Sequence, residues 1–247
     1  MAEEIFINVS ANETRVGVVD QGLLQEVFIE RTETKSIVGN IYKGKVVRIL
    51  PGMQSAFVDI GQEKAAFMHV TDLVDGHEVF DKEPGASLPA ITSLVYDGQE
   101  LLVQVTKDPI GTKGARITSN LSMASRYLVY LPGSSHIGIS QRIEDDAERA
   151  RLTGILEDLS DSEEGFIVRT AAENAAGEEI VKDAGYLRRR WEGIRREGLV
   201  ARSPEVIFED LPLPLRVMRD IINKNTSGIL VDNSETHTVL SRFLSDY

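Results

Sequence analysis

Two phenylalanines, Phe57 and Phe67, have the spacing and the neighbours needed to bind single-stranded nucleic acid. Side chains alternate across a β-strand, so each ring would point away from the aliphatic residues on either side of it. Aromatic rings on the outside of a small barrel can stack on bases, and nearby lysines can bind phosphates. The lysines predicted to act with these rings are Lys43, Lys45 and Lys113.

A second interpretation of the same pattern stays open. If both faces of the two strands are buried, Phe57 and Phe67 are core residues, as most phenylalanines are. Lys113 could likewise be an ordinary solvated lysine, because its loop lacks the G-x-x-x-x-G-K-[ST] spacing of a nucleotide-binding P-loop. The residues predicted to form the aliphatic face are Ala56, Val58 and Ile60 in the first strand and Ala66, Met68 and Val70 in the second.

Arg169 and Thr170 close an apolar run, at the end of a strand predicted over 165–170. A guanidinium group, a hydroxyl group and backbone N–H groups can together bind a terminal phosphate. Taken alone, an Arg-Thr pair at a strand end more often forms a surface salt bridge. The pair is therefore a candidate phosphate site that needs support from elsewhere.

Candidate catalytic and metal-binding residues are few. Asp20 and Asp232 could face one another and hold Mg²⁺ for RNA hydrolysis, although aspartates at turns and strand ends are usually structural. The four histidines have no paired metal spacing, and the absence of cysteine excludes disulfides and thiolate metal sites. We predict no catalytic residue and no metal ligand, and keep a self-contained nuclease based on the two aspartates as an alternative.

Composition allows two or three modest domains in 247 residues. The chain has no run of 18 apolar residues and an acidic N-terminus, so we expect neither a membrane span nor a signal peptide, and a cytoplasmic location. The net charge of −12 would disfavour nucleic acid if it were evenly spread. Only charges within a Debye length of about 8 Å matter locally, however.

Basic residues gather in or beside the predicted barrel, whereas acidic residues are concentrated at 144–164. RNA binding in one groove is therefore possible, and it should be weak and salt-sensitive. A separate basic run, Arg188–Arg190 with Arg195 and Arg196, would spread around a helix and is predicted to be solvated surface. The further basic residues noted beside the barrel are Arg48, Lys107 and Arg116.

The order of the predicted elements indicates an α+β protein with several domains. An N-terminal meander is too small to bury a core alone, and the last part of the chain could complete it. The strands of the meander are predicted at 4–9, 14–20 and 24–30. The C-terminal part would supply a helix over 204–224 that is interrupted near Pro212 and Pro214. It would also supply a strand at 228–233 and a final helix capped by Ser234.

Between these two parts we predict a barrel with a loop insertion at 75–93, where Asp, Gly, Glu and Pro dominate. A further unit follows. Its strands are predicted at 127–131 and 165–170 and its helices near 145–159 and 178–197. In the second helix, Leu187, Trp191 and Ile194 recur at helical spacing and are predicted core residues.

Several motifs carry a family resemblance. The run GNIYKGKVVRILPGMQSAFVDIGQEKAAF resembles the RNA-binding OB domain, of the type named after ribosomal protein S-one, in the ribonuclease E/G family, and more closely its ribonuclease G branch. The similarity covers nearly the whole chain, and several motifs in one order are far more specific than any single one. The other motifs are TKDPIGTKGARIT, SRYLVYLPG, GISQRIED and FIVRTAAE.

The resemblance implies a domain arrangement. An OB-fold β-barrel at 37–118 and a 5′-sensor α/β unit at 119–203 would be inserted into a discontinuous ribonuclease H-like α/β domain, formed by 1–36 and 204–247. The family's ribonuclease H-like layer has lost its catalytic set. Its working aspartates lie in a later DNase I-like domain, followed by zinc-linking cysteines. The chain would then be an N-terminal portion, inactive by itself, and the missing stop signal after its last helix agrees with a cut there.

The resemblance also implies site residues and partners. Arg169 and Thr170 would bind a 5′-monophosphate, Val129 would contribute a backbone contact, and Arg142 would lie nearby. The intact protein would be a homo-oligomeric, Mg²⁺-dependent endoribonuclease that cleaves single-stranded RNA in rRNA processing and mRNA decay, with no cofactor in this portion. An OB-fold RNA-binding module without end preference remains the other alternative.

Overall fold

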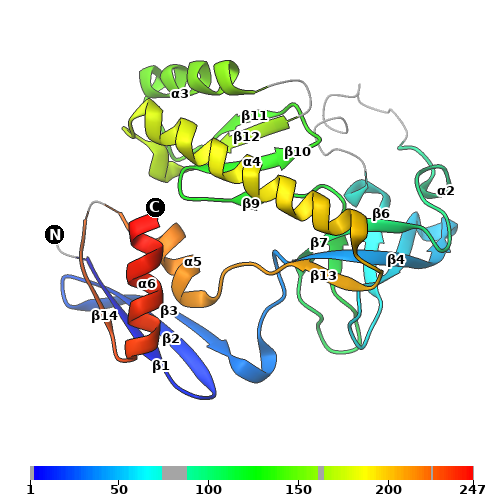
Figure 1. The fold of residues 1–247 in the computed structure, drawn as a ribbon, viewed down its shortest axis with the longest axis horizontal. Helices are drawn as coiled ribbons and strands as arrows, with labels where there is room; N and C mark the ends of the chain where they lie inside the picture. The colour runs from blue at the N-terminus through cyan, green and yellow to red at the C-terminus, as the bar shows by residue number, and fades with distance from the viewer. Residues whose placement is uncertain (1–2, 74–87, 161–163, 224, 247) are drawn as a thin grey trace. The chain divides into compact units, whose positions relative to one another are not determined.

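The computed structural model describes residues 3–73, 88–160, 164–223 and 225–246 (Figure 1). The chain forms two compact units, of which the first, called here the discontinuous unit, joins its two ends. The second, the continuous unit, holds a barrel and a smaller sheet. The discontinuous unit comprises Met1–Ser36 and Leu211–Tyr247, and the continuous unit comprises Ile37–Asp210.

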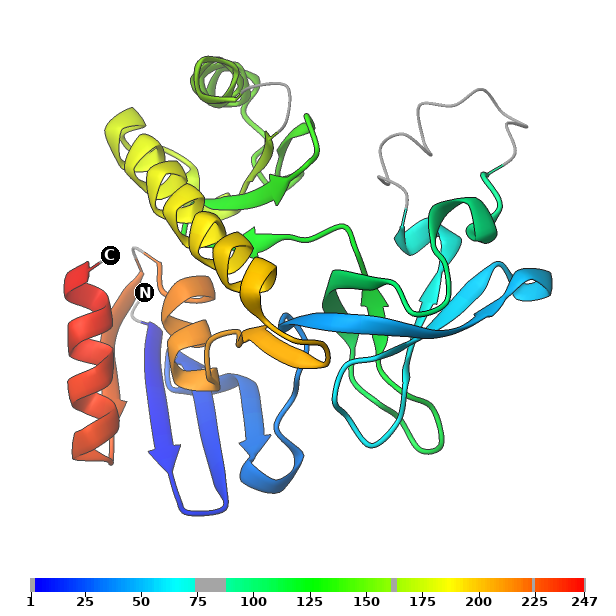
Figure 2. The ribbon, with the colours of Figure 1, turned by 45° about the vertical axis from the view of Figure 1, so that its right-hand side comes forward.

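The discontinuous unit is a four-stranded sheet in the order β14-β1-β2-β3, with two helices packed on one face (Figure 2). Strands β1 to β3 form the predicted antiparallel meander, and β14 pairs parallel to β1. Ile5, Val16 and Val217 are buried between sheet and helices. The elements are β1 (Glu3–Val9), β2 (Glu13–Asp20), β3 (Leu23–Arg31), β14 (Thr226–Val231), α5 (Leu213–Asp220), α6 (Ser234–Asp246) and the 3₁₀ helix η1 (Thr32–Thr34).

The helix predicted over 204–224 is wrong in its first part. Residues Glu205–Phe208 form strand β13, which pairs antiparallel with strand β4 (Ile41–Leu50) of the barrel. The apolar residues of this segment suit a pleated surface, and long-range strand pairing overrides the local pattern. Helix α5 begins only after Pro212, with Pro214 in its first turn, because proline is tolerated there and not in a helix interior. The predicted cap of the last helix also shifts, since Thr236 donates its N–H to Asn233.

The barrel of the continuous unit is a five-stranded closed sheet of OB-like form. Its strands follow the order β4-β5-β6-β8-β7, and β7 pairs back to β4. The α+β class and the barrel agree with the sequence-based expectation. The barrel elements are β4 (Ile41–Leu50), β5 (Ser55–Asp59), β6 (Ala66–His69), β7 (Glu100–Lys107), β8 (Arg116–Thr118), α2 (Ile91–Leu94) and the 3₁₀ helices η2 (Pro51–Met53) and η3 (Val70–Asp72). Most of the loop insertion predicted at 75–93 lies outside the described residues.

The smaller sheet has the order β11-β12-β10-β9, with α3 packed on β11 and α4 on β10. Leu187 and Ile194 of α4 are buried and Trp191 packs against the same core, which confirms their predicted role. The Asp145 carboxylate caps α3 by accepting from Ala147 N. The elements are β9 (Met123–Ala124), β10 (Leu128–Pro132), β11 (Ile137–Ile139), β12 (Glu164–Val168), α3 (Asp146–Leu159), α4 (Gly177–Val200) and the 3₁₀ helix η4 (Thr170–Ala172).

The basic run on α4 is only partly solvated surface. Arg189, Arg195 and Arg196 are exposed, as predicted. Arg188 instead pairs with Glu164 and lies over the ring of Phe166, 5.5 Å from its centroid. Arg190 lies 4.9 Å from the ring centroid of Phe208. The helix has one face on the core, so arginines at the margin of that face can place their guanidinium groups over aromatic rings.

Candidate nucleic-acid interface

Phe57 and Phe67 face each other on neighbouring strands β5 and β6. Their ring centroids are 6.1 Å apart and their planes are inclined at 68°, an edge-to-face contact. Both rings are partly exposed, whereas the alternating residues Ala56, Val58 and Met68 are buried in the barrel. The alternative in which both phenylalanines are core residues is therefore wrong.

The two rings line an open groove of about 740 Å³ on the outside of the barrel. Its lining includes four basic residues and one acidic residue, so the local charge is positive although the whole chain is acidic. The acidic residue, Asp108, accepts a hydrogen bond from Ile37 N at 2.8 Å. The basic residues of the groove are Lys64, Lys107, Lys113 and Arg116.

Lys113 reaches the groove because its loop packs tightly against the start of β6. A Cβ atom at Gly114 would lie 2.0 Å from the carbonyl oxygen of Ala65, so only glycine fits. Ile110 and Lys113 exchange backbone hydrogen bonds, and Lys64 Nζ donates to Gly111 O at 2.7 Å. The loop thus fixes Lys113 at the wall of the groove.

The structure does not bring Lys43 or Lys45 into the groove lining. Lys43 Nζ donates to Ala201 O at 3.0 Å and lies 3.4 Å from the Glu100 carboxylate, with its side chain 15% exposed. A cation is favourable there, because Ala201 caps the carboxyl end of α4. Lys45 is exposed and lies opposite Asp59 in the backbone register of β4 and β5.

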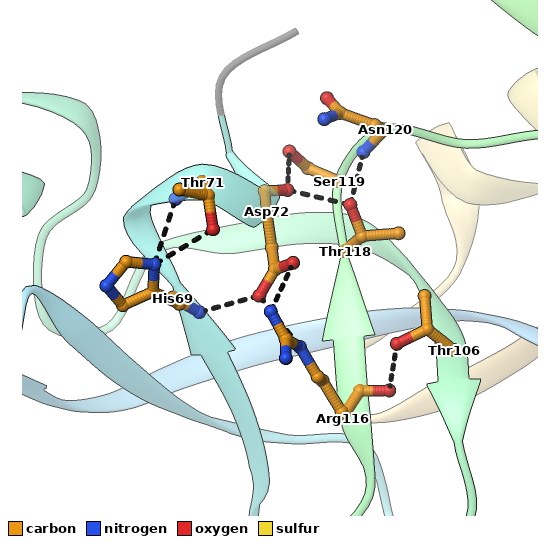
Figure 3. Close-up of polar contacts among 8 residues, drawn as sticks. All are labelled: His69, Thr71, Asp72, Thr106, Arg116, Thr118, Ser119 and Asn120. Carbon is orange, nitrogen blue, oxygen red and sulfur yellow. Dashed lines mark hydrogen bonds and ion pairs between the residues drawn. The ribbon is translucent and has the colours of Figure 1, made fainter. Parts of the chain in front are cut away.

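Arg116 forms the edge of the groove next to Phe67, its backbone partner between β6 and β8. Figure 3 shows its guanidinium directed at Asp72, which accepts from Nε at 3.3 Å and from Nη2 at 3.2 Å. His69 N donates to the same carboxylate at 2.9 Å, and Thr118 Oγ1 donates to the Asp72 carbonyl at 2.8 Å. The two hydrogen bonds from Arg116 to Asp72 hold the guanidinium plane in one orientation at the edge of the groove.

A second cluster forms at one edge of the smaller sheet. Arg169 and Thr170 directly follow β12, and the parallel strand β11 ends at the same edge, shortly before Arg142. Strand β10 runs antiparallel to β12, so it begins there, and Val129 pairs with Ile167. The sheet topology therefore brings all four residues predicted for phosphate binding to one edge.

Both sides of this edge are tied to the Arg169–Thr170 pair. Arg169 Nη1 donates to Ser125 O, and Arg169 N donates to Tyr127 O at 2.8 Å. On the other side, the hydroxyl groups of Ser140 and Thr170 are hydrogen-bonded at 3.0 Å. Thr170 and Arg142 are exposed and Arg169 is partly exposed, so the cluster is open to a ligand.

The two aspartates of the nuclease alternative lie at opposite ends of their sheet. Asp20 pairs with Glu3 at the start of β1, whereas Asp232 accepts from Val9 N at its far end. At about 3.3 Å per residue, some 15–20 Å separates them. The hydrogen bonds from Val9 N and Asn8 lower the pKa of Asp232, which has a structural role. Among the described residues no cluster of three His, Asp or Glu could hold a metal ion.

A family model described as "Ribonuclease E/G family" matches residues 122–247. The chain belongs to the ribonuclease E/G family. The ribonuclease G proteins of Escherichia coli (strain K12) and Salmonella typhimurium (strain SL1344) are each 45% identical to it over 100% of the chain and 51% of their own length. A ribonuclease E from Nostoc sp. is 36% identical over 85% of the chain and 30% of its own length.

These identities confirm the resemblance to the ribonuclease E/G family and its ribonuclease G branch. The chain spans about half the length of the ribonuclease G relatives. Membership of the ribonuclease E/G family and the OB-like barrel together support an RNA-binding region. Within the part of the chain that the structure describes, no helix is long and apolar enough to cross a membrane.

Proposed function

We propose that the chain supplies the RNA-binding and 5′-monophosphate-sensing portion of a ribonuclease G-like endoribonuclease, a hydrolase of single-stranded RNA. The observation that carries this proposal is the outward pair of Phe57 and Phe67 in a groove whose charged lining residues are four basic and one acidic. Membership of the ribonuclease E/G family and the sequence identity with ribonuclease G relatives support RNA as the ligand. The protein's expected setting is cytoplasmic rRNA processing and mRNA decay, as a homo-oligomer.

The groove would provide most of the affinity for RNA, independently of the 5′ end. Bases stacked on Phe57 and Phe67 contribute about 1–3 kcal/mol each, independently of sequence. Lys113 and the other groove cations would bind phosphates, and Lys45 could extend the contact along the outer surface. Because cations that contact phosphates release counterions from the RNA, this binding should weaken as salt rises.

Preference for a 5′-monophosphate would come from the second cluster. Arg169 and Thr170 offer charge-assisted and hydroxyl hydrogen bonds, Val129 offers its backbone, and Arg142 adds a second cation at the same edge. Hydrogen bonds to charged groups contribute about 1.5–3 kcal/mol. Each 1.4 kcal/mol is tenfold in affinity, so loss of Arg169 should reduce the preference about tenfold to a hundredfold.

Catalysis is not assigned to the described residues of this chain. Mg²⁺ needs several converging oxygen ligands, and Asp20 and Asp232 are too far apart to share an ion. The proposal therefore assigns the Mg²⁺-dependent step to the further domain that the family resemblance implies, and expects this portion alone to be inactive. We also propose that the discontinuous unit is a ribonuclease H-like domain and that residues 119–203 form the 5′-sensor domain.

The test is fluorescence anisotropy with one short unstructured RNA, carrying either a 5′-monophosphate or a 5′-hydroxyl group, at two salt concentrations. We expect binding of both, tighter for the monophosphate, and a reduction of that difference by about tenfold to a hundredfold in Arg169→Ala. Equal binding of the two ends would favour a module without end preference. For a variant of the groove such as Phe57→Ala, the matched control is Tyr96→Ala. Tyr96 is an exposed aromatic residue of the same unit that lies outside the groove lining.

A further inference from the structure

Asp183 of helix α4 holds the segment of chain that precedes β10. A single carboxylate oxygen, Oδ2, accepts from Ser125 Oγ, from Tyr127 N at 3.1 Å and from Leu128 N at 3.1 Å. The partners lie more than fifty positions away in sequence, so this is a tertiary contact between the helix and the sheet edge. Ser125 is fully buried, which makes the contact part of the packed interior.

The same segment holds Arg169 through its carbonyl groups. Arg169 Nη1 donates to Ser125 O, and Arg169 N donates to Tyr127 O at 2.8 Å. The segment therefore directs N–H and hydroxyl donors toward Asp183 and carbonyl acceptors toward Arg169. The Leu128 N–H and the Tyr127 carbonyl belong to one planar peptide unit, so a shift of this N–H at Asp183 must also move the carbonyl group that accepts from Arg169 N.

Charge reinforces this arrangement. Burial raises the pKa of the Asp183 carboxyl, while its hydrogen bonds with Ser125, Tyr127 and Leu128 and the positive charge of Arg169 act in the opposite direction. A carboxylate with three donors on one oxygen has little freedom to change its partners. The guanidinium of Arg169 is planar and rigid, so fixing one terminal nitrogen restricts the orientation of the whole group.

We propose that Asp183 is a positioning residue for the 5′-phosphate site. Its carboxylate fixes Arg169 through the segment from Ser125 to Leu128, and it does not touch RNA itself. This inference rests on the proposed function. Its physical basis is preorganisation: a side chain already ordered before binding loses less conformational freedom when the phosphate arrives. Ordering of one long side chain corresponds to about threefold to tenfold in affinity.

The experiment measures the ratio of dissociation constants for 5′-hydroxyl and 5′-monophosphate RNA in Asp183→Asn. We expect the ratio to fall about threefold to tenfold while affinity for the hydroxyl RNA stays unchanged. Asp158→Asn is the matched control, because Asp158 is an exposed aspartate on the neighbouring helix α3. Circular dichroism checks that the variants are folded.

A double-mutant cycle with Arg169→Ala separates positioning from a general structural effect. If Asp183 acts through Arg169, Asp183→Asn should cause no further loss of the ratio in the Arg169→Ala background. An equal loss in both backgrounds, or an unchanged ratio in Asp183→Asn, would overturn the inference. If the wild-type chain itself shows no end preference, it is the proposed function that fails. Should Asp183→Asn not fold, Ser125→Ala removes one donor, and an unchanged ratio there overturns the inference equally.

Discussion

Arg116 donates two hydrogen bonds to the carboxylate of Asp72, across 44 positions of sequence, at the edge of the aromatic groove. Asp72 also accepts a hydrogen bond from His69 N at the end of β6, so its carboxylate binds a backbone N–H group and an arginine at the same time. Only part of the Asp72 side chain is reached by solvent, 14% against 43% for Arg116. The pair therefore belongs to the barrel structure as much as to the groove.

Replacing Asp72 with alanine should destabilise the chain. The change leaves His69 N without its acceptor and Arg116 without its carboxylate, and we expect a loss of about 1–2 kcal/mol, typical of a removed cap plus a partly screened ion pair. Urea unfolding followed by circular dichroism measures this loss. Asp97→Ala, at an exposed position of the same unit, should change stability by less than about 0.5 kcal/mol. Equal midpoints for the two variants would contradict the prediction.

The two faces of strand β5 should separate binding from stability. Phe57→Ala removes a partly exposed ring and should weaken RNA binding about fivefold to a hundredfold with little loss of stability. Val58→Ala, one position further, empties a fully buried site and should cost about 1–3 kcal/mol of stability while leaving the groove lining intact. Anisotropy and urea unfolding on both variants test the pair. The prediction fails if Phe57→Ala binds RNA normally.

Local periodicity predicted the faces of β5 and β6 correctly, because alternation is a property of each strand alone. The same sequence could not predict the Asp72–Arg116 pair, which exists only because barrel closure places β8 beside β6. The helix expected over 204–224 failed for a similar reason. Val206 pairs with Tyr42 across the barrel edge, and no local pattern contains that partner.

The candidate sites divide in the same way. Phe57, Phe67 and Lys113 share one groove, as their residue types and neighbours suggested. Lys43 looked equivalent in sequence, yet it points to the carboxyl end of α4 and to Glu100, both distant along the chain. Lys64 was missed because nothing near it in sequence marks it; the groove wall that it forms depends on the 109–114 loop.

Lys113 and Lys43 should differ in the salt dependence of RNA binding. Each phosphate contact on single-stranded RNA contributes about 0.7 to the slope of log K against log salt. Lys113→Ala should therefore reduce the slope by about that amount. Lys43→Ala should leave the slope unchanged and instead lower stability by up to about 1 kcal/mol, because it removes a cation from a helix end. RNA titrations at four or more salt concentrations measure the slope for each variant. Identical slopes for Lys113→Ala and Lys43→Ala would contradict the prediction.

The acid stability of the continuous unit should depend on Glu148. Its carboxylate accepts two hydrogen bonds from Arg151 at 2.7 Å and one from Asn174 N at 2.8 Å, and these partners lower the pKa of Glu148 from 4.5 to about 2. A lowered pKa in the folded state means that the ionised form stabilises the fold. The stabilisation is complete above about pH 4.5 and is lost as the pH falls toward 2.

Glu148→Gln should accordingly flatten the acid limb of the stability curve. Because Arg151 is 38% exposed, solvent screening reduces the effect, and we expect a difference of about 1–2 kcal/mol between wild type and variant at pH 6. That difference should shrink as both proteins are moved from pH 5 to pH 2.5, where Glu148 becomes increasingly protonated. Urea unfolding across this range measures it, with Glu157→Gln, an exposed residue of α3, as the matched control. A difference independent of pH would show that Glu148 stabilises the fold through packing and not through its charge.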